Sequence, residues 1–228
     1  MNIVTIILWI IIILLLYYVY TKFLTSSTSL TASQVNLNNT NATLPFSNFK
    51  SGYSSQYSYG VWVYVNSWNT NNVKTIFSRN GAMSIGGNTY TDFTLQLDNV
   101  TPNLYCYLGL QGSSTPQKIL VTPNFPIQAW TYVVISVDNQ IVDAYINGKF
   151  VLSSKMPKMP VVSTSDIAMG DAGLPDIFLM GLTRWDYPMD PQTVWTTYLK
   201  GNGQSSSNFN MVVTTYQNNV EQSQFSLF

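Results

Sequence analysis

The sequence predicts an all-β fold, a two-sheet antiparallel sandwich or jelly roll with one short helix late in the domain, preceded by a single transmembrane helix. Three observations carry this prediction. After residue 45 the apolar residues recur with the period of two that strands show, and not with the helical period of 3.6. Turn signals rich in Gly, Asn and Pro separate these runs. Near the N-terminus, in contrast, lies one apolar stretch of helical length.

This apolar stretch, IVTIILWIIIILLLYYVY at residues 3–20, contains no charge. At about 1.5 Å per residue it approaches the roughly 30 Å thickness of a hydrocarbon core. Tyrosines cluster at its end, where amphipathic rings favour the headgroup layer. No base precedes it and no small-residue cleavage site follows, so we expect an uncleaved anchor at residues 1–23, with the lipid bilayer as partner. The residues that define this anchor are Ile3, Trp9, Leu16, Tyr17, Tyr18, Tyr20 and Lys22.

The orientation of the anchor is set by few residues. Lys22 is the side-chain cation next to the apolar stretch, and its position favours a domain on the cytosolic side of the membrane. The chain has a single cysteine, Cys106, so no intrachain disulfide forms, which agrees with a reducing compartment. Glycosylation acceptor patterns at Asn38, Asn41 and Asn99 would suit the opposite side. We expect a single-pass membrane protein with its domain in the cytosol.

The chain after the anchor divides into a linker and a domain. Residues 24–44 are rich in Ser, Thr and Asn and uncharged, which predicts a polar linker or stalk, with room for one extended segment that packs on a partner. The domain is expected over residues 45–203. Its first strand, at 57–65, is apolar on both faces, as in a strand that is buried on both sides. Residues 93–98 alternate cleanly, and the run at 104–110 returns after a turn.

A hairpin is predicted in the middle of the domain. Residues 133–137 and 142–146 alternate around a short polar turn. Asn147 and Gly148 then supply the two positive φ values of a tight type I′ turn, after which residues 149–152 return. Short strands with turns at this spacing are typical of a β-sandwich or jelly roll. Cys106 lies in a strand-like run and is interpreted as a small core residue.

One helix is predicted near the end of the domain, at residues 190–201. Asp190 is a suitable N-cap, Pro191 suits the first helical position, and Lys200 and Gly201 are typical of a helix end. A stripe of apolar residues is expected to pack on the sandwich. This stripe consists of Val194, Trp195, Tyr198 and Leu199.

The low charge of the chain bears on its partners. Charged residues make up 9% of the sequence, against about 25% in an average protein, and ten acids balance ten bases. No basic field would attract nucleic acid, and a surface this neutral suggests one that other proteins cover. The extension at 204–228 is apolar and almost uncharged, so we expect it to pack on the domain or on a neighbouring subunit. Its expected partner contacts are Phe209, Tyr216, Phe225 and Phe228.

Three segments resemble, in the right order, successive parts of a laminin G-like, concanavalin A-type jelly roll of the lectin and glucanase group: YSYGVWVYV, FPIQAWTYVVISVDNQIVDAYINGKFV and DIFLMGLTRWDYPMDPQTVWTTYLKG. The resemblance covers residues 45–203. Characteristic family positions are occupied by Trp62, Trp130, Asn147, Gly148, Gly181 and Trp185. It implies two facing antiparallel sheets, and a ligand that is a glycan or a protein in some members and absent in others.

The residues that catalysis would need are missing. Glucanases of this group use paired carboxylates about 5–5.5 Å apart, whereas this chain has a single glutamate, Glu221 in the tail. It has no histidine, which excludes a Ser-His-Asp triad and makes a zinc site implausible. We therefore expect no enzyme, no catalytic or cofactor-binding residue and no assigned metal ligand. Calcium is the residual cofactor, through Asp166, Asp171 and Asp176 in loop-like sequence, although such residues also stabilise turns.

Two functions are therefore compatible with the sequence. The favoured one is a membrane-anchored structural protein that binds other proteins of a large assembly, similar to minor capsid proteins that join the internal membrane of large icosahedral DNA viruses to the capsid shell. Its location would be the inner membrane of a virion. The alternative is a membrane-anchored carbohydrate-binding or adhesion module, for which exposed aromatic residues would stack on sugars. Fold alone does not choose between the two.

Overall fold

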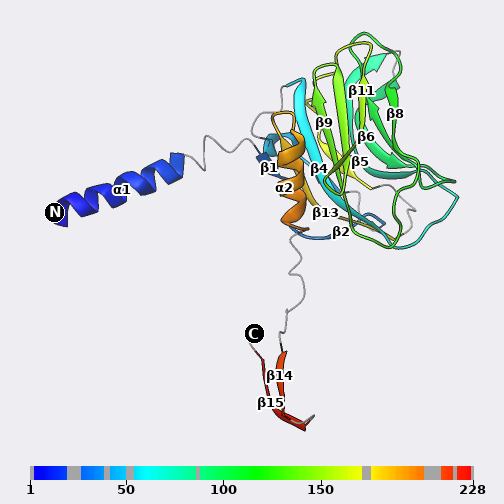
Figure 1. The fold of residues 1–228 in the computed structure, drawn as a ribbon. Coiled ribbons are helices and arrows are strands. Elements are labelled where there is room, and N and C mark those ends of the chain that lie inside the picture. Colours follow the sequence, from blue (N-terminus) through cyan, green and yellow to red (C-terminus); the bar gives the residue numbers. More distant parts are fainter. Residues whose placement is uncertain are drawn as a thin grey trace.

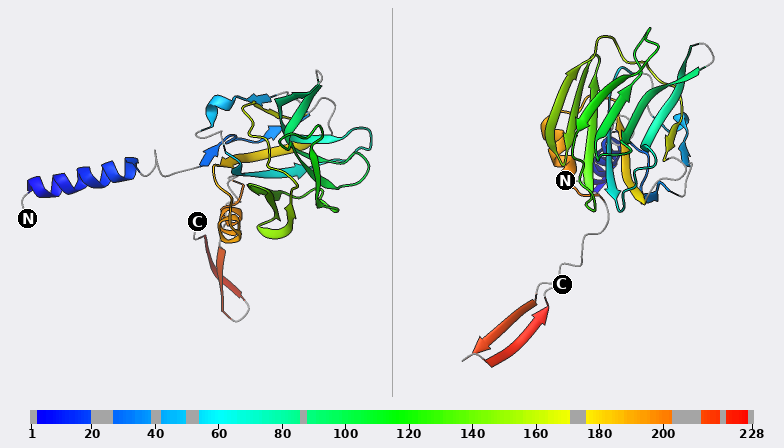
Figure 2. Two further views of the ribbon diagram at one scale, coloured as in Figure 1. Left: turned by 90° about the horizontal axis from the view of Figure 1, so that it is seen from above. Right: turned by 90° about the vertical axis from the view of Figure 1, so that its right-hand side faces the viewer.

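The computed structural model shows a two-layer β-sandwich with a helix on the outer face of one layer (Figure 1). The two layers lie face to face in Figure 2, and the core fills the space between them. The all-β, two-sheet antiparallel fold predicted from the sequence is thereby confirmed. The structure describes residues 3–19, 27–38, 42–49, 54–85, 88–170, 176–202, 212–217 and 220–226.

The first layer, sheet A, is an antiparallel sheet. Its strands are β1 (Ser27–Ser29), β2 (Val35–Asn36), β4 (Gln56–Val65), β9 (Thr131–Asp138), β10 (Ile141–Ile146), β11 (Lys149–Lys155) and β13 (Ile177–Trp185). They lie in the order β1, β13, β4, β9, β10, β11, and β2 also pairs with β13. The late strand β13 is therefore placed between the N-terminal strand β1 and the first long strand of the domain.

The second layer, sheet B, is also antiparallel. Its strands are β3 (Ala42–Leu44), β5 (Lys74–Ile85), β6 (Asn88–Leu97), β7 (Leu104–Leu108), β8 (Gln117–Thr122) and β12 (Ile167–Met169). They lie in the order β3, β12, β5, β6, β7, β8. A short 3-10 helix at Phe46–Asn48 follows β3.

The two kinds of strand pattern in the sequence match two kinds of burial. In β7, Leu104, Cys106 and Leu108 are fully buried, while the tyrosines between them point outward and are half-buried. Burial raises the pKa of the Cys106 thiol, as expected for a core residue. Almost every residue of β4 is buried, because the sandwich core covers one face and α2 (Pro191–Leu199) the other. The prediction of a strand buried on both sides is confirmed.

The predicted tight turn joins β10 and β11. Asn147 and Gly148 have φ values of +50° and +77°, as a type I′ turn requires. The Asn147 side chain accepts a hydrogen bond from the backbone amide of Tyr132, at 2.8 Å. A Cβ on Gly148 would lie 2.7 Å from the Trp195 ring of α2, so only glycine fits there. The turn thus fixes the hairpin and also supports the helix.

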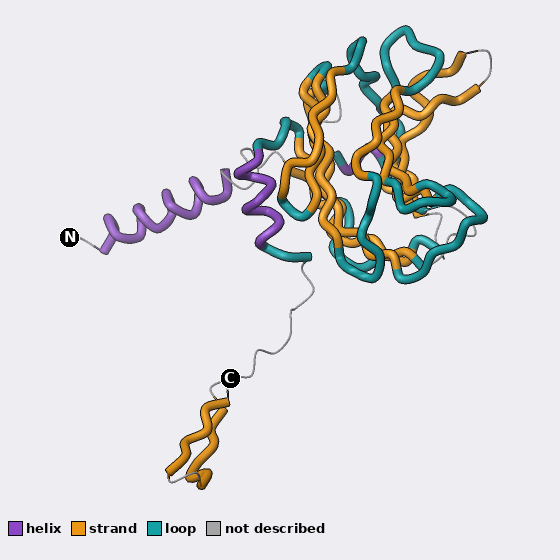
Figure 3. The backbone as a smooth tube through the Cα atoms, turned by 45° about the vertical axis from the view of Figure 1, so that its right-hand side comes forward, coloured by secondary structure: helices purple, strands orange, loops and turns teal. Residues whose placement is uncertain are grey.

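Helix α2 has the predicted N-cap but buries less than predicted. The Asp190 carboxylate accepts hydrogen bonds from the first turn of the helix, at 2.9 and 3.0 Å. The helix lies beside the strands of the sandwich (Figure 3). Val194 is fully buried, and Tyr198 packs on Trp62 and Tyr132 of sheet A. Trp195 and Leu199, however, are 39% and 64% exposed. The expectation that all four apolar residues pack inward was wrong. Only the narrow face of this nine-residue helix that is directed at the sheet is buried, whereas the four apolar residues cover a wider arc of the helix surface.

The segment expected to be a linker contributes to both sheets. Strands β1 and β2 pair with β13, and β3 pairs with β12. Leu37 is fully buried in the core. Residue 37 and the three short strands therefore belong to the sandwich, which differs from the stalk predicted at 24–44. Polar strands of two or three residues carry too few side chains to show an alternating pattern.

Helix α1 (Ile3–Val19) and a C-terminal hairpin are not part of the two sheets of the sandwich. Helix α1 carries exposed apolar side chains along its length. Within the described residues, no helix combines the length and the apolar character needed to cross a membrane. Near the C-terminus, β14 (Val212–Gln217) and β15 (Val220–Ser226) form an antiparallel hairpin.

Candidate functional site

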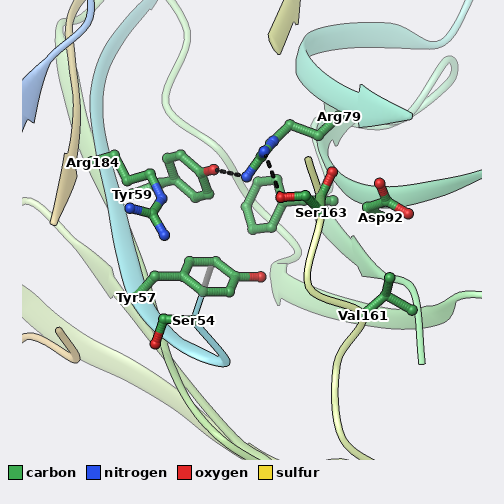
Figure 4. A pocket seen from close by; sticks show the side chains of 9 residues that line it. Ser54, Tyr57, Tyr59, Arg79, Asp92, Val161, Ser163 and Arg184 are labelled. Carbon is green, nitrogen blue, oxygen red and sulfur yellow. Dashed lines mark hydrogen bonds between the residues drawn. The ribbon is translucent and has the colours of Figure 1, made fainter. Parts of the chain in front are cut away.

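The interior of the sandwich contains two buried arginines, Arg79 of β5 and Arg184 of β13 (Figure 4). Arg79 donates hydrogen bonds to the Tyr59 hydroxyl at 3.1 Å and to the carbonyls of Ser163 and Ser165, at 2.9 to 3.1 Å. The cavity beside these residues measures about 10 Å³, which is close to the space of one water molecule. The cavity is therefore too small to hold a ligand.

The charged groups of this interior cluster interact with other side chains of the domain. Arg184 forms an ion pair with Asp186. Its guanidinium also lies 5.6 Å from the Tyr57 ring, and Arg79 lies 5.0 Å from the Phe49 ring, both within cation–π range. Burial, above all, lowers the pKa of Arg184 and raises that of Tyr57. We interpret the cluster as a polar clamp that joins the two sheets.

The outer face of sheet B has a shallow polar hollow of about 310 Å³. It contains hydroxyl and amide side chains but, among the described residues that line it, no aromatic ring and no ionisable group. Its lining residues are Thr75, Ser78, Asn80, Thr94, Gln96 and Gly170. Such a hollow could exchange hydrogen bonds with a ligand but offers it little apolar surface.

A groove of about 270 Å³ lies on the outer face of sheet A, between α2 and the strands β1 and β13. Its floor is aromatic and is formed by Trp62 of β4, Tyr132 of β9 and Trp185 of β13. The residues that complete its walls and rim are Ser29, Thr31, Ala32, Gly181, Thr183, Thr197, Lys200, Gly201 and Asn202. An apolar floor with a few polar groups around it is the usual composition of a small-molecule site.

The aromatic floor of the groove is closely packed. The ring centroids of Trp62 and Tyr132 are 5.0 Å apart, and Tyr198 of α2 stacks on Trp62 at 5.6 Å. Gly60 lies beside the floor, where a Cβ would come within 2.6 Å of the Tyr132 hydroxyl and 2.7 Å of the Trp185 ring. The rings can therefore approach β4 only because residue 60 has no side chain. A floor packed in this way is held in place before any ligand binds.

A bulge in β13 shapes the wall of the groove. The pairing of β13 with β4 shifts between Met180 and Thr183, and Gly181 has a φ of +61°. The backbone amide of Leu182 is directed toward the N-terminal segment, on the edge of β13 opposite β4, and donates a hydrogen bond to the Thr31 hydroxyl at 2.8 Å. The N-terminal segment is thus required to complete this wall.

The rim can exchange hydrogen bonds in both directions. The Thr183 and Thr197 hydroxyls donate to backbone carbonyls, at 3.2 and 2.8 Å, and keep their oxygens available as acceptors. The Thr31 hydroxyl already accepts a bond and can donate one. Burial raises the pKa of Tyr132, so its hydroxyl stays protonated. Among the described residues that line the groove, Lys200 alone is charged at neutral pH and none carries a carboxylate.

Two of the three residues considered for calcium, Asp166 and Asp176, are described by the structure. Asp166 accepts a hydrogen bond from the amide of Phe46 at 2.8 Å and so joins two loops. Asp176 directly precedes β13, and Asp171 lies outside the described residues. Within the described part of the chain, no group of three or more His, Cys, Asp or Glu residues could hold a metal ion.

The anchor and tail residues are only partly described. Helix α1 contains Ile3, Trp9, Leu16, Tyr17 and Tyr18. Tyr20 and Lys22 lie outside the described residues, as do Phe209 and Phe228 of the tail. Tyr216 falls in β14 and Phe225 in β15, where Phe225 pairs with Val213. The expected partner contacts of these residues stay predictions.

The groove was not predicted from the sequence. Trp62, Gly181 and Trp185 had been noted as family positions, but nothing in the sequence placed them together with Tyr132 and Thr31. They come from three strands and from the segment after β1, and long-range pairing brings these elements together. The signal that could have helped is the outward position of Trp62 in a strand that is apolar on both faces, which requires a second covering layer.

Comparison with known proteins agrees with this architecture. Residues 36–202 match a laminin G-type family of the concanavalin A-like lectin/glucanases superfamily, and the chain belongs to this family. No curated protein matches the chain. Among solved structures it is similar to the binding domain of botulinum neurotoxin serotype G, with 18% identity, a TM-score of 0.56 and coverage of 73% of this chain and 42% of that one.

A second similar structure is the binding domain of botulinum neurotoxin serotype D. Its identity is 15% and its TM-score 0.52, with coverage of 76% of this chain and 41% of the other. The chain therefore spans about two fifths of the length of either neurotoxin domain. At this identity the similarity concerns the fold.

Proposed function

We propose that this chain is a membrane-anchored, non-enzymatic binding module that recognises a carbohydrate in the groove beside α2. The observation that carries the proposal is the composition of the groove: Trp62, Tyr132 and Trp185 in the floor, neutral hydroxyl groups on the rim, and no carboxylate among its described residues. A sugar presents one apolar ring face and several hydroxyls, so it matches an aromatic floor and a rim that both donates and accepts hydrogen bonds.

The family and the similar structures support a binding role. The superfamily includes lectins. One similar structure, with a TM-score of 0.52 and 16% identity, is described as the receptor-binding domain of botulinum neurotoxin D. Retaining glycosidases need two carboxylates about 5–5.5 Å apart. The single glutamate, Glu221, belongs to β15, and the described lining of the groove contains no carboxylate, which supports binding without hydrolysis.

The membrane anchor of this proposal is α1. Its sequence is apolar on all sides apart from Thr5, so it lacks the polar face of a helix that lies on a membrane surface. Its 17 residues correspond to about 26 Å, short of the roughly 30 Å of a hydrocarbon core, so the proposed span also needs the residues that follow α1 in the sequence. The uncharged stretch continues to Tyr20, and Lys22 follows at the expected headgroup level.

A glycan-array experiment tests the carbohydrate site. The full chain in detergent would be screened first, and the best ligand titrated into two variants. Thr183→Val removes a rim hydroxyl, and Thr75→Val makes the same change in the hollow on sheet B. We expect Thr183→Val to weaken binding roughly three- to tenfold, the loss of about one hydrogen bond, and Thr75→Val to leave it unchanged. Absence of any glycan ligand, or a loss confined to Thr75→Val, would refute the proposed groove.

A second candidate function is the structural one: a minor capsid component that tethers an internal membrane to a protein shell, with other shell proteins as partners. The low charge of the chain, 9%, favours it, because a free surface normally carries more charge. So do large exposed apolar side chains at the edge of sheet A, such as Phe150 and Val151, which are 53% and 43% exposed. Chemical cross-linking in native membranes would test it by identifying stable protein neighbours.

Membrane topology distinguishes the two functions. Lys22 favours a domain on the cytosolic side, where a shell or scaffold would be met. The acceptor site at Asn99 precedes the exposed residues Val100 and Thr101 in a turn and would suit the other side, where glycans are displayed. Protease treatment of sealed membranes, combined with a glycosidase mobility test, reads the side directly. A protected, glycosylated domain supports the carbohydrate module, and a digested, unmodified one supports the structural role.

A further inference from the structure

One apolar surface of the domain is left open next to the groove. On α2, Trp195 and Leu199 are four residues apart, so they share a helix face, and they are 39% and 64% exposed. The Trp195 ring lies against Gly148 in the β10–β11 turn, and Phe150, two residues further on, is 53% exposed. We call these three side chains the α2 patch: Trp195 in the middle of the helix, Leu199 at its C-terminal end, and Phe150 on the adjoining edge strand, opposite Tyr145.

The charges around the α2 patch are unevenly distributed. Lys149 and Lys200 are exposed and flank it. The nearby carboxylates lie toward the start of the helix: Asp190 caps it, and Asp143 lies opposite Ser136. Burial first, and then these two acids, raise the pKa of Tyr145, whose ring contacts that of Phe150 with the centroids 5.5 Å apart, so the acids approach the patch on its Phe150 side. The hydroxyl of Ser136 accepts from the amide of Met189, directly before the helix, which places both acids at the N-terminal end. The patch therefore combines apolar side chains with basic flanks.

The covalent connection to the proposed anchor limits the distance between the α2 patch and the membrane. Helix α1 ends at Val19 and β1 begins at Ser27, so eight peptide steps of at most about 3.5 Å give a reach of roughly 28 Å. Strand β1 belongs to sheet A, whose outer face carries α2. Ser29 and Lys200 line the same groove. The end of the helix and the attachment point of the anchor are thus on the same side of the domain.

We propose that the α2 patch is a second membrane contact, through which Phe150, Trp195 and Leu199 insert into the headgroup layer of the bilayer that holds α1. Aromatic and aliphatic side chains flanked by lysines are the composition found at such interfaces, since the rings favour the headgroup level and the lysines attract anionic lipids. This inference rests on the proposed anchor, and it adds a fixed orientation of the sandwich. Sheet A faces the membrane and sheet B faces away from it.

Site-specific labelling tests this contact. Cys106 is fully buried, so a second cysteine on the surface can be labelled selectively. Leu199→Cys would carry an environment-sensitive fluorophore on the patch, and Leu120→Cys, on the opposite outer face in β8, is the matched control. Leu120 is 42% exposed, so both changes are tolerated by the fold. The full-length variants would be reconstituted into phosphatidylcholine–phosphatidylserine vesicles, with and without brominated acyl chains.

The expected result is a blue-shifted emission and bromolipid quenching for the label at position 199, and neither effect for the label at position 120. Extraction at alkaline pH reports separately on the anchor. If the protein resists extraction but the two labels behave alike, the anchor stands and the α2 patch does not contact lipid. A label at 199 that is shielded without quenching indicates a protein partner and equally overturns the inference. If the protein is released by alkali, the proposed anchor fails and the inference falls with it.

Discussion

Gly60 should be among the positions of the sandwich least tolerant of added volume. It lies in β4 opposite Val134, and its φ is not in the left-handed region, so an alanine meets no backbone strain. A Cβ there would lie 2.6 Å from the Tyr132 hydroxyl and 2.7 and 2.9 Å from two atoms of the Trp185 ring. Real Cβ atoms do not approach so closely, so the rings must move.

The size of the effect follows from two opposing contributions. Overpacking of a closed core costs about 1–3 kcal/mol. Alanine lowers the entropy of the unfolded chain relative to glycine, which contributes about 0.4–1 kcal/mol in the other direction. With the middle of each range, Gly60→Ala should lower the free energy of unfolding by about 1.3 kcal/mol. At this chain length, each kcal/mol corresponds to about 2–4 °C in Tm.

Urea unfolding of the full chain, followed by tryptophan fluorescence, would measure this loss. Tyr132→Phe removes the oxygen at 2.6 Å and should recover part of it, so that the two changes together cost less than their sum. Because the displaced rings form the floor of the groove, Gly60→Ala should also weaken ligand binding. A variant as stable as the wild type, or more stable, would refute the close packing on which the floor depends.

The remaining predictions concern stability and reactivity. Hydrogen bonds, chiefly from Thr193, lower the pKa of Asp190. The charged cap therefore stabilises the fold at neutral pH, and this contribution is lost as the pH falls through that pKa. Asp190→Asn should flatten this part of the pH–stability profile. Asp190→Ala should cost about 1 kcal/mol in thermal unfolding at neutral pH. Cys106 should resist alkylation in the native protein and react only after denaturation, as mass spectrometry would show. Arg79→Ala leaves buried carbonyls without a donor and should cost about 3–5 kcal/mol, against about 1 kcal/mol for Tyr59→Phe, by the same unfolding assay.

The features that were predicted from the sequence depend on local physics. The N-cap at Asp190 and the turn at Asn147-Gly148 are determined within a few residues by hydrogen bonding and φ. Alternation in β7 and continuous apolarity in β4 follow from which faces are covered. The cap and the turn act before any tertiary contact forms, and the two strand patterns show in the sequence itself which faces are covered, so all four can be read without knowing the fold.

The features that were not predicted depend on pairing between distant segments. Ser27 of β1 pairs with Trp185, far away in the sequence, and the hydroxyl of Thr31 satisfies the bulge at Leu182. Neither the composition nor the periodicity of the sequence indicates such contacts. The groove is assembled from them, so its location could not be derived from the sequence. The exposure of Leu199 has the same origin, because the area of sheet beneath a helix determines which of its faces is buried.

The bulge of β13 also has a mechanical consequence. Strand β1 pairs with three residues of β13, and Leu30 and Thr31 continue this connection through hydrogen bonds to Leu182. Any tension applied to the chain on the N-terminal side of residue 27 is therefore carried first by this short strand. Its detachment would remove one wall of the groove while the sandwich core stayed folded. In optical tweezers this would be a small first extension step, which a bound ligand should delay. The domain would then release its ligand under load well before it unfolds.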